Sequence, residues 1–230
     1  LVYEFNEWGY RTKNIDDLDK DFALVFGCSY TEGIGLYQKD IWCEKLCKEL
    51  DIDIFNLAKG GSSPCISYMN TTLYAKNLIR YKPKLVIYQW PQAFRRTFSH
   101  LQEKSEKVIM ADEYDLKMVG YNINTEASNM DMSWFKDRWL KEDGEMYKDS
   151  FFNFYSTDIL WKALDVPVYH WTWSGDFTNK YDKPFGFIQD NEIRVIKNKS
   201  NDKARDNGHD GKQIHSDVVD FLIDDIRKLL

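Results

Sequence analysis

One short polar segment of this chain combines residue types that can carry out nucleophilic catalysis. Ser29 lies in the run Gly27-Cys28-Ser29-Tyr30-Thr31, between the apolar residues 22–26 and an amphipathic stretch over about 39–50. This order predicts a strand, a tight polar turn and a helix. A serine at the mouth of a strand is well placed to attack a substrate once a base removes its proton. We therefore interpret Ser29 as a candidate nucleophile.

A candidate base lies near the other end of the chain, in the turn-rich segment 204–211. Asp206 and His209 are three residues apart there, just before the apolar stripe of a predicted last helix over 216–230. This spacing lets the carboxylate hold one ring nitrogen of His209 while the other faces the serine. Alone, the pair would be an ordinary surface loop, but with the serine turn it predicts a Ser-His-Asp triad. The thiol of Cys28 is the alternative nucleophile.

Alternating strands and helices must bring these distant residues together. Strands are predicted over 22–26, 52–57, 84–90, 166–173 and 193–196, and helices over about 39–50, 65–81, 147–164 and 216–230. This alternation predicts an α/β fold of the flavodoxin-like type. It is a three-layer sandwich with a central, mainly parallel sheet of four to five strands and helices on both faces. The loops at the carboxyl ends of the strands should then converge on a site.

The length of 230 residues predicts a single domain over 1–230. Residues 1–21 are polar and rich in turns, and we expect them to form an arm that lies on the domain. The segment 98–146 has no clean period and is too long for a simple connection. We expect it to be an insertion or cap after the third strand.

Three segments, in chain order, resemble sequence blocks of the SGNH, or GDSL-like, hydrolase family. The serine run 27–31 is similar to the first block, GDSxT, with Cys28 in place of Asp. The segment Asn56-Leu57-Ala58-Lys59-Gly60-Gly61-Ser62-Ser63 is similar to the second block, and Asp206-Asn207-Gly208-His209 is similar to the DxxH block. Together they span the chain from the first strand to the final helix.

The resemblance implies a serine ester hydrolase that needs no metal or organic cofactor. Ser29 would attack the ester carbonyl, His209 would transfer the proton, and Asp206 would orient His209. The backbone N–H groups of Ser29 and Gly61 would stabilise the oxyanion, with Gly60 as the alternative to Gly61.

The third block of the family, Gly-x-Asn-Asp, is missing, because the third strand ends Tyr88-Gln89-Trp90-Pro91-Gln92. The side-chain amides of Gln89 and Gln92 are the candidates to replace the family's Asn as an oxyanion donor. Loss of one such donor lowers the rate by about 10²–10³. A non-catalytic carbohydrate-binding or structural module is therefore the alternative function, and an O-acyltransferase with the same triad is a third.

Residues near the predicted active edge indicate a substrate class. Arg95 and Arg96 are candidates for binding an anionic substrate group, with surface ion pairs as the alternative. Trp90 is a further candidate substrate contact. Four other tryptophans are candidates either for stacking on a sugar or for the core, namely Trp134, Trp139, Trp171 and Trp173. These features favour short acyl esters of a saccharide as the substrate.

The composition limits the partners of the protein. A net charge of −6 argues against nucleic acid, and no apolar run approaches the length that crosses a membrane. The oligomeric state stays open. The cysteines are Cys28, Cys43, Cys47 and Cys65. We expect small core residues in a reducing compartment such as the cytoplasm, with disulfides or metal ligands as the alternative. His170 and His215 are expected to be packing residues.

Overall fold

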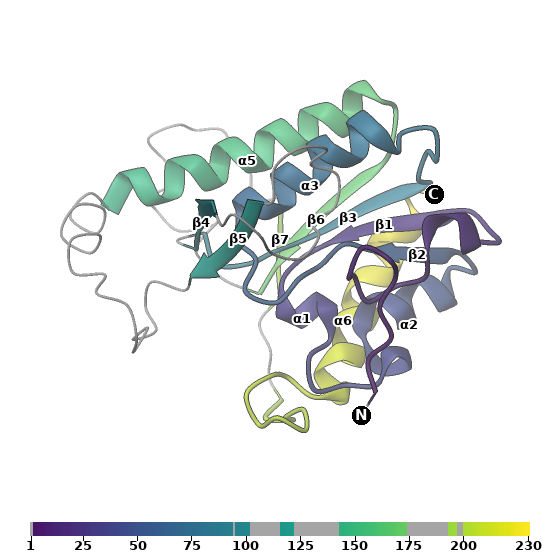
Figure 1. Ribbon diagram of the computed structural model, residues 1–230. Helices are drawn as coiled ribbons and strands as arrows, with labels where there is room; N and C mark the ends of the chain where they lie inside the picture. Colours follow the sequence, from purple (N-terminus) through teal and green to yellow (C-terminus); the bar gives the residue numbers. More distant parts are fainter. Residues whose placement is uncertain (1, 94, 102–115, 122–142, 174–192, 197–199) are drawn as a thin grey trace.

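The centre of the protein is a parallel β-sheet (Figure 1). The computed structural model describes residues 2–93, 95–101, 116–121, 143–173, 193–196 and 200–230, with the backbone alone for 96–101, 116–121 and 143–147. The five strands are β1 (Phe22–Phe26), β2 (Asp53–Asn56), β3 (Leu85–Trp90), β6 (Val168–Thr172) and β7 (Arg194–Val195). They pair in the order β2-β1-β3-β6-β7, and every pair is parallel. The predicted fold class is confirmed.

Helices cover both faces of this sheet (Figure 1). They are α1 (Ser29–Glu32), α2 (Trp42–Glu49), α3 (Pro64–Asn77), α5 (Asp143–Ala163) and α6 (Lys212–Arg227), with 3-10 turns η1 (Ile15–Asp17) and η2 (Gln38–Asp40). Helices α2 and α6 pack together on one face, and α3 and α5 pack on the other. None of the helices in the described ranges is both long enough and apolar enough to cross a bilayer.

Strand β1 lies between β2 and β3 in the sheet and is buried on both faces. Ala23 and Val25 belong to the apolar cluster beneath α2 and α6, whereas Phe22, Leu24 and Phe26 belong to the cluster beneath α3 and α5. Successive side chains of a strand point to opposite faces, so a strand covered on both faces is apolar at every position. This explains the unbroken apolar run before Ser29.

All four predicted helices have different boundaries in the structure. The helices expected over 147–164 and 216–230 each begin four residues earlier, as α5 at Asp143 and α6 at Lys212. The one expected over 65–81 ends at Asn77, and the Tyr74 hydroxyl then donates to the carbonyl of Tyr81 at 2.6 Å. The one expected over 39–50 is divided into η2 and α2, because Ile41 between them has extended backbone, with φ −73° and ψ 138°. The candidate nucleophile itself begins a short helix, α1, where a simple turn was expected.

The segment predicted as an insertion contains regular structure. Strands β4 (Arg96–Leu101) and β5 (Leu116–Tyr121) pair as an antiparallel hairpin, and α5 begins at Asp143. The remaining positions, 102–115 and 122–142, lie outside the described residues. Trp134 and Trp139 are among them, so their predicted roles stay predictions. The single-domain organisation also stays a prediction.

Candidate active site

Ser29 lies at the carboxyl end of β1, as the first residue of α1, and its side chain is half-buried. The glycine at position 27 lets α1 begin this close to the end of β1. A Cβ at Gly27 would lie only 2.4 Å from the Thr31 Oγ1 atom in α1. The first N–H groups of a helix have no acceptor inside it. The backbone N–H of Ser29 is therefore free to donate to a substrate. In the part of the chain that the structure describes, the Ser29 hydroxyl has no hydrogen-bond partner.

Gln89 lies beneath this turn, contrary to the prediction that its amide donates to the oxyanion. The residue is 1% exposed, and its Oε1 atom accepts hydrogen bonds from the Cys28 N–H at 3.3 Å and the Thr31 hydroxyl at 3.1 Å. Its Nε2 atom donates to the Trp90 carbonyl at 2.8 Å. The amide thus supports the backbone around Ser29 from below and is engaged on both its oxygen and its nitrogen.

Gln92, the second predicted amide donor, is half-buried just beyond β3. Its Oε1 atom is buried and has no hydrogen-bond partner among the described residues. Unlike Gln89, Gln92 makes no side-chain hydrogen bond to the residues around Ser29 among the described contacts. Gln92 therefore stays a candidate oxyanion donor.

A tight turn after β2 supplies the candidate backbone donors. The Ser62 N–H donates to the Lys59 carbonyl at 3.1 Å, and Gly61, the third residue of the turn, has φ +77°. This is the pattern of a type II turn, in which a positive φ at the third position favours glycine. The N–H of Gly60 donates to the Glu32 Oε2 atom at 2.6 Å. Within the described contacts the N–H of Gly61 has no acceptor, so Gly61 is the available donor and Gly60 is not.

Asp206 and His209 form the close pair that their spacing predicts. The Nδ1 atom of His209 lies 2.5 Å from the Oδ2 atom of Asp206. The Oδ1 atom of Asp206 accepts from the backbone N–H groups of Gly208 and His209, each at 3.1 Å. Burial acts to raise the pKa of Asp206, but the hydrogen bonds from His209 and Gly208 outweigh it and lower that pKa. The carboxylate is held ionised and fixes the orientation of the imidazole.

The loop that carries this pair packs against the segment that follows Ser29. A Cβ built at Gly35 would lie 2.7 Å from the Ala204 Cβ and 3.1 Å from the Asp206 Oδ1 atom. The Arg205 N–H donates to the Gly35 carbonyl at 3.4 Å. In Figure 1 the loop before α6 and helix α1 lie at the same end of the molecule. Among the described contacts, no hydrogen bond joins the Ser29 hydroxyl directly to the His209 ring.

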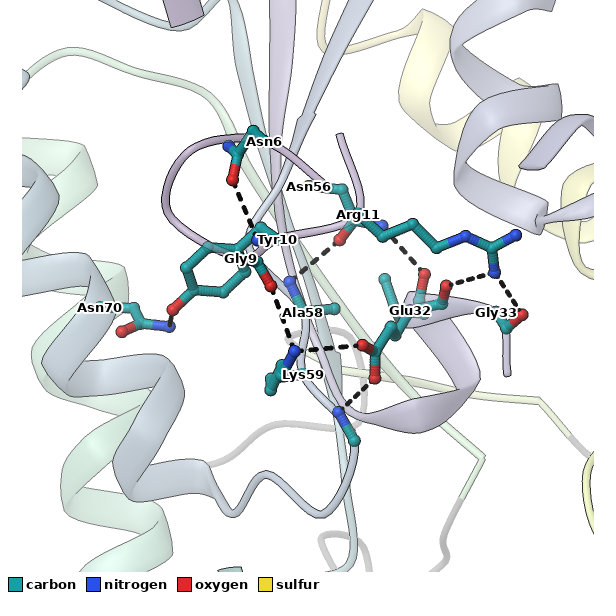
Figure 2. A network of polar contacts seen from close by, with 12 residues as sticks. Asn6, Gly9, Tyr10, Arg11, Glu32, Gly33, Asn56, Ala58, Lys59 and Asn70 are labelled. Carbon is teal, nitrogen blue, oxygen red and sulfur yellow. Dashed lines mark hydrogen bonds and ion pairs between the residues drawn. The ribbon is translucent and has the colours of Figure 1, made fainter. Parts of the chain in front are cut away.

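Residues near the amino terminus form hydrogen bonds both to the segment around α1 and to the turn that follows β2 (Figure 2). Arg11 is 1% exposed, and its guanidinium donates to three backbone carbonyls, those of Glu32 at 3.1 Å, Gly33 at 2.6 Å and Leu36 at 2.8 Å. Burial lowers the pKa of Arg11. Lys59 donates to the Gly9 carbonyl at 3.1 Å and lies 3.6 Å from a carboxylate oxygen of Glu32. Sequence reasoning missed Arg11 and Glu32. The signal for Glu32 was its place three residues after the candidate serine.

The predicted substrate contacts divide into core and site residues. Trp90 is fully buried among Tyr88, Phe154 and His170, and its Nε1 donates to the His170 Nδ1 at 3.0 Å. Strand β3 is covered there by α5, so the predicted substrate contact of Trp90 is wrong. Arg95 is half-buried beside the turn after β2, and its Nη1 donates to the Ser62 carbonyl at 3.5 Å.

Three further predicted positions can be placed in the fold. Arg96 begins β4, and its side chain lies outside the described part of the structure. Trp171 is fully buried in the core beside Trp42, and Trp173 packs against the same cluster. Trp171 is therefore a core residue, and Trp173 is partly buried at the edge of the core.

Two histidines outside the candidate triad are packing residues, as predicted. The ring of His215 stacks on Tyr30 at 4.3 Å between centroids, and its Nδ1 accepts from the Trp42 N–H at 3.0 Å. Burial, with smaller contributions from Lys45 and His209, lowers the pKa of His215 to about 3. His170 is buried beneath α5, and its Nε2 lies 3.3 Å from an Asp158 carboxylate oxygen.

None of the four cysteines, all of which lie in the described part of the chain, forms a disulfide. Cys28, Cys43 and Cys47 lie in the apolar cluster with α2 and α6, as predicted for small core residues, and Cys65 is half-buried. Burial raises the pKa of the Cys43 and Cys47 thiols well above the ordinary value. In the ranges that the structure covers, no three His, Cys, Asp or Glu side chains form a group able to hold a metal ion.

Comparison with known proteins identifies the fold. No protein-family model matches the chain, and no curated protein matches its sequence. The psychrotrophic esterase EstA from Pseudoalteromonas sp. aligns with 90% of this chain and 97% of its own, with a TM-score of 0.51 and 14% identity. An acetyl xylan esterase from the rumen bacterium Butyrivibrio proteoclasticus aligns with 90% of this chain and 64% of its own, with a TM-score of 0.53 and 13% identity. The fold is that of the SGNH hydrolases, and the predicted resemblance is confirmed at the level of fold.

Proposed function

We propose that this chain is a serine ester hydrolase with Ser29 as nucleophile, His209 as general base and acid, and Asp206 as the residue that orients His209. The observation that carries the proposal is the 2.5 Å pair of Asp206 and His209, on a loop packed against the segment that follows Ser29. The fold shared with known esterases supports it.

The proposed reaction has two halves. The Ser29 Oγ atom attacks the ester carbonyl carbon while the His209 Nε2 atom accepts the hydroxyl proton. The tetrahedral intermediate then breaks its bond to the alcohol, which takes that proton from His209 and leaves an acyl-serine. Water attacks the acyl-serine, again with proton transfer through His209, and the carboxylic acid and free serine are released. Asp206, kept ionised by its hydrogen bonds, stabilises the imidazolium in both halves.

Backbone groups supply the oxyanion hole in this proposal. The N–H of Ser29, at the first position of α1, and the N–H of Gly61 are donors that have no acceptor among the described residues. The amide of Gln92 is the candidate for a third. Gln89 is not proposed as a donor, because it is bonded to the turn beneath the serine. Without a third donor, the rate is expected to be about 10²–10³ lower than in an enzyme that has one.

We propose short acyl esters of a saccharide as the substrate class. The likeness in fold to an acetyl xylan esterase supports this choice. Arg95, beside the turn that contains Gly61, is the candidate contact for a polar or anionic group of the substrate. Its buried Nε atom has no partner among the described residues.

One observation favours a second function, a non-catalytic carbohydrate-binding module. The engagement of Gln89 beneath the turn removes one of the two candidates to replace the side-chain donor of the missing third block. Such a module would keep the fold and bind a saccharide without cleaving it.

Covalent labelling with a fluorophosphonate tests the proposed hydrolase directly, because only an activated serine reacts. We expect the wild type to be labelled at Ser29 and to hydrolyse p-nitrophenyl acetate. Ser29→Ala should abolish both, and Ser156→Ala on α5 serves as a matched control with wild-type behaviour. Equal ester hydrolysis by wild type and Ser29→Ala would refute the proposal.

A saccharide added to the same assay separates the remaining functions. Faster consumption of the acyl donor with a sugar acceptor, and acylated sugar as the product, would indicate an O-acyltransferase. Saccharide binding by both wild type and Ser29→Ala, without labelling of either, would indicate the binding module.

A further inference from the structure

Glu32 lies between the candidate nucleophile and the turn that carries Gly61. It is the last residue of α1, three positions after Ser29, and only 8% of its surface is exposed. Its Oε2 atom accepts a hydrogen bond from the Gly60 N–H at 2.6 Å, and the Lys59 Nζ atom lies 3.6 Å from its Oε1 atom (Figure 2). Hydrogen bonds to an ionised group are shorter and about twice as strong as neutral ones. The Glu32 side chain therefore holds the turn through its backbone.

The fit around Gly60 shows how this bond sets the approach of the turn to the serine. A Cβ built at Gly60 would lie 3.0 Å from the Glu32 Oε2 atom and 3.8 Å from the Ser29 Cβ. The turn therefore lies in contact range of both residues at once. Two further backbone bonds extend the pairing of β1 and β2 toward this point, from Leu57 N–H to Val25 O at 2.8 Å and from Lys59 N–H to Gly27 O at 3.3 Å.

The same bond determines which backbone group is left for a substrate. The N–H of Gly60 is consumed by Glu32, whereas that of Gly61 has no acceptor among the described contacts. A donor stabilises an oxyanion well only if it is fixed in place before the charge develops.

We propose that Glu32 is a positioning residue for ester hydrolysis, whose carboxylate anchors Gly60 so that the N–H of Gly61 is held beside Ser29 as an oxyanion donor. The inference rests on the proposed function. Glu32 touches no reacting atom and acts through the backbone of the turn. It is further held by its own main chain, because Arg11 donates to its carbonyl at 3.1 Å.

Steady-state kinetics of Glu32→Ala and Glu32→Gln test this role with p-nitrophenyl acetate. Glu32→Ala should lower kcat by about 100-fold, the effect of losing one oxyanion donor, with a change in KM of less than about threefold. Glu32→Gln keeps an oxygen that can accept from Gly60 and should stay within about tenfold of wild-type kcat. Glu49→Ala, an exposed position on α2, is the matched control and should behave as wild type.

Amide exchange of Gly60 gives a readout that does not depend on activity. Exchange at Gly60 should be at least about tenfold faster in Glu32→Ala, whereas exchange at Leu57 should be unchanged. The inference alone fails if the wild type is active and Glu32→Ala keeps its kcat, or if Glu32→Ala and Glu32→Gln lose kcat equally. An inactive, unlabelled wild type would instead refute the proposed function, and the inference with it.

Discussion

The support that Gln89 gives to the serine turn leads to a prediction about stability. The substitution Gln89→Leu keeps most of the side-chain volume but removes the amide. In the wild type, the Gln89 Oε1 atom accepts hydrogen bonds from the Cys28 N–H and the Thr31 hydroxyl, and both donors are buried. Each buried donor left without an acceptor costs about 1–3 kcal/mol. The expected loss in the free energy of unfolding is therefore about 2–6 kcal/mol, a large part of the roughly 5–15 kcal/mol of a typical domain.

Urea unfolding followed by tryptophan fluorescence measures this loss, and fluorophosphonate labelling measured on the same samples reports the state of the serine. The matched control is Gln213→Leu, because Gln213 is an exposed glutamine of α6. Among the described residues, its side chain bonds to its helix neighbour Asp217 alone, and its backbone N–H donates to Asp202. Its effect should be within about 0.5 kcal/mol.

One outcome would distinguish support of the serine turn by Gln89 from donation to the oxyanion. If Gln89→Leu has wild-type stability but loses labelling by more than about 100-fold, Gln89 acts on the oxyanion and not on the turn. That result would restore the role predicted from the sequence and refute the one derived from the structure.

Three further predictions follow from buried polar groups. Because burial lowers the pKa of His215 from 6.5 to about 3, the unfolded chain binds a proton below pH 6.5 that the folded chain does not. Stability from this group is complete above pH 6.5 and should fall by about 1.4 kcal/mol per pH unit on acidification, which urea unfolding at pH 7, 6 and 5 will measure. Arg11→Met removes the guanidinium donors of three carbonyls and should cost at least about 1–3 kcal/mol, the penalty for one buried polar group left without a partner, seen as a lower urea midpoint; an unchanged midpoint would mean that the arm does not stabilise the fold. Thiol-reactive labelling followed by mass spectrometry should modify Cys65 first and leave Cys43 and Cys47 unmodified until the protein unfolds; early modification of Cys43 would contradict its burial.

Local sequence patterns were sufficient to predict the sheet and the contact between Asp206 and His209. The strands are apolar runs bounded by turn residues, and a strand buried on both faces has no other way to be stable. The pairing of Asp206 with His209 follows from a short turn and three-residue spacing, so it needed no knowledge of the tertiary structure.

Contacts between distant segments could not be predicted in the same way. Trp90 is at a strand end, which favoured a substrate contact, but β3 pairs there with β6 and α5 covers it. An arginine in a polar arm is normally exposed, and nothing near Arg11 in the sequence indicates the carbonyls of 32, 33 and 36 that hold it. The role of Gln89 was predicted wrongly because its Oε1 atom bonds to Cys28, which lies about sixty residues earlier in the chain.

The separation of the candidate site residues along the chain also has a consequence for biosynthesis. On the proposed assignment, Ser29 leaves the ribosome with β1, well before Asp206 and His209, which lie just before α6. A nascent chain that ends before Asp206 has Ser29 without its proposed base. On this assignment, reactivity toward esters should arise only after the segment that carries His209 has been made.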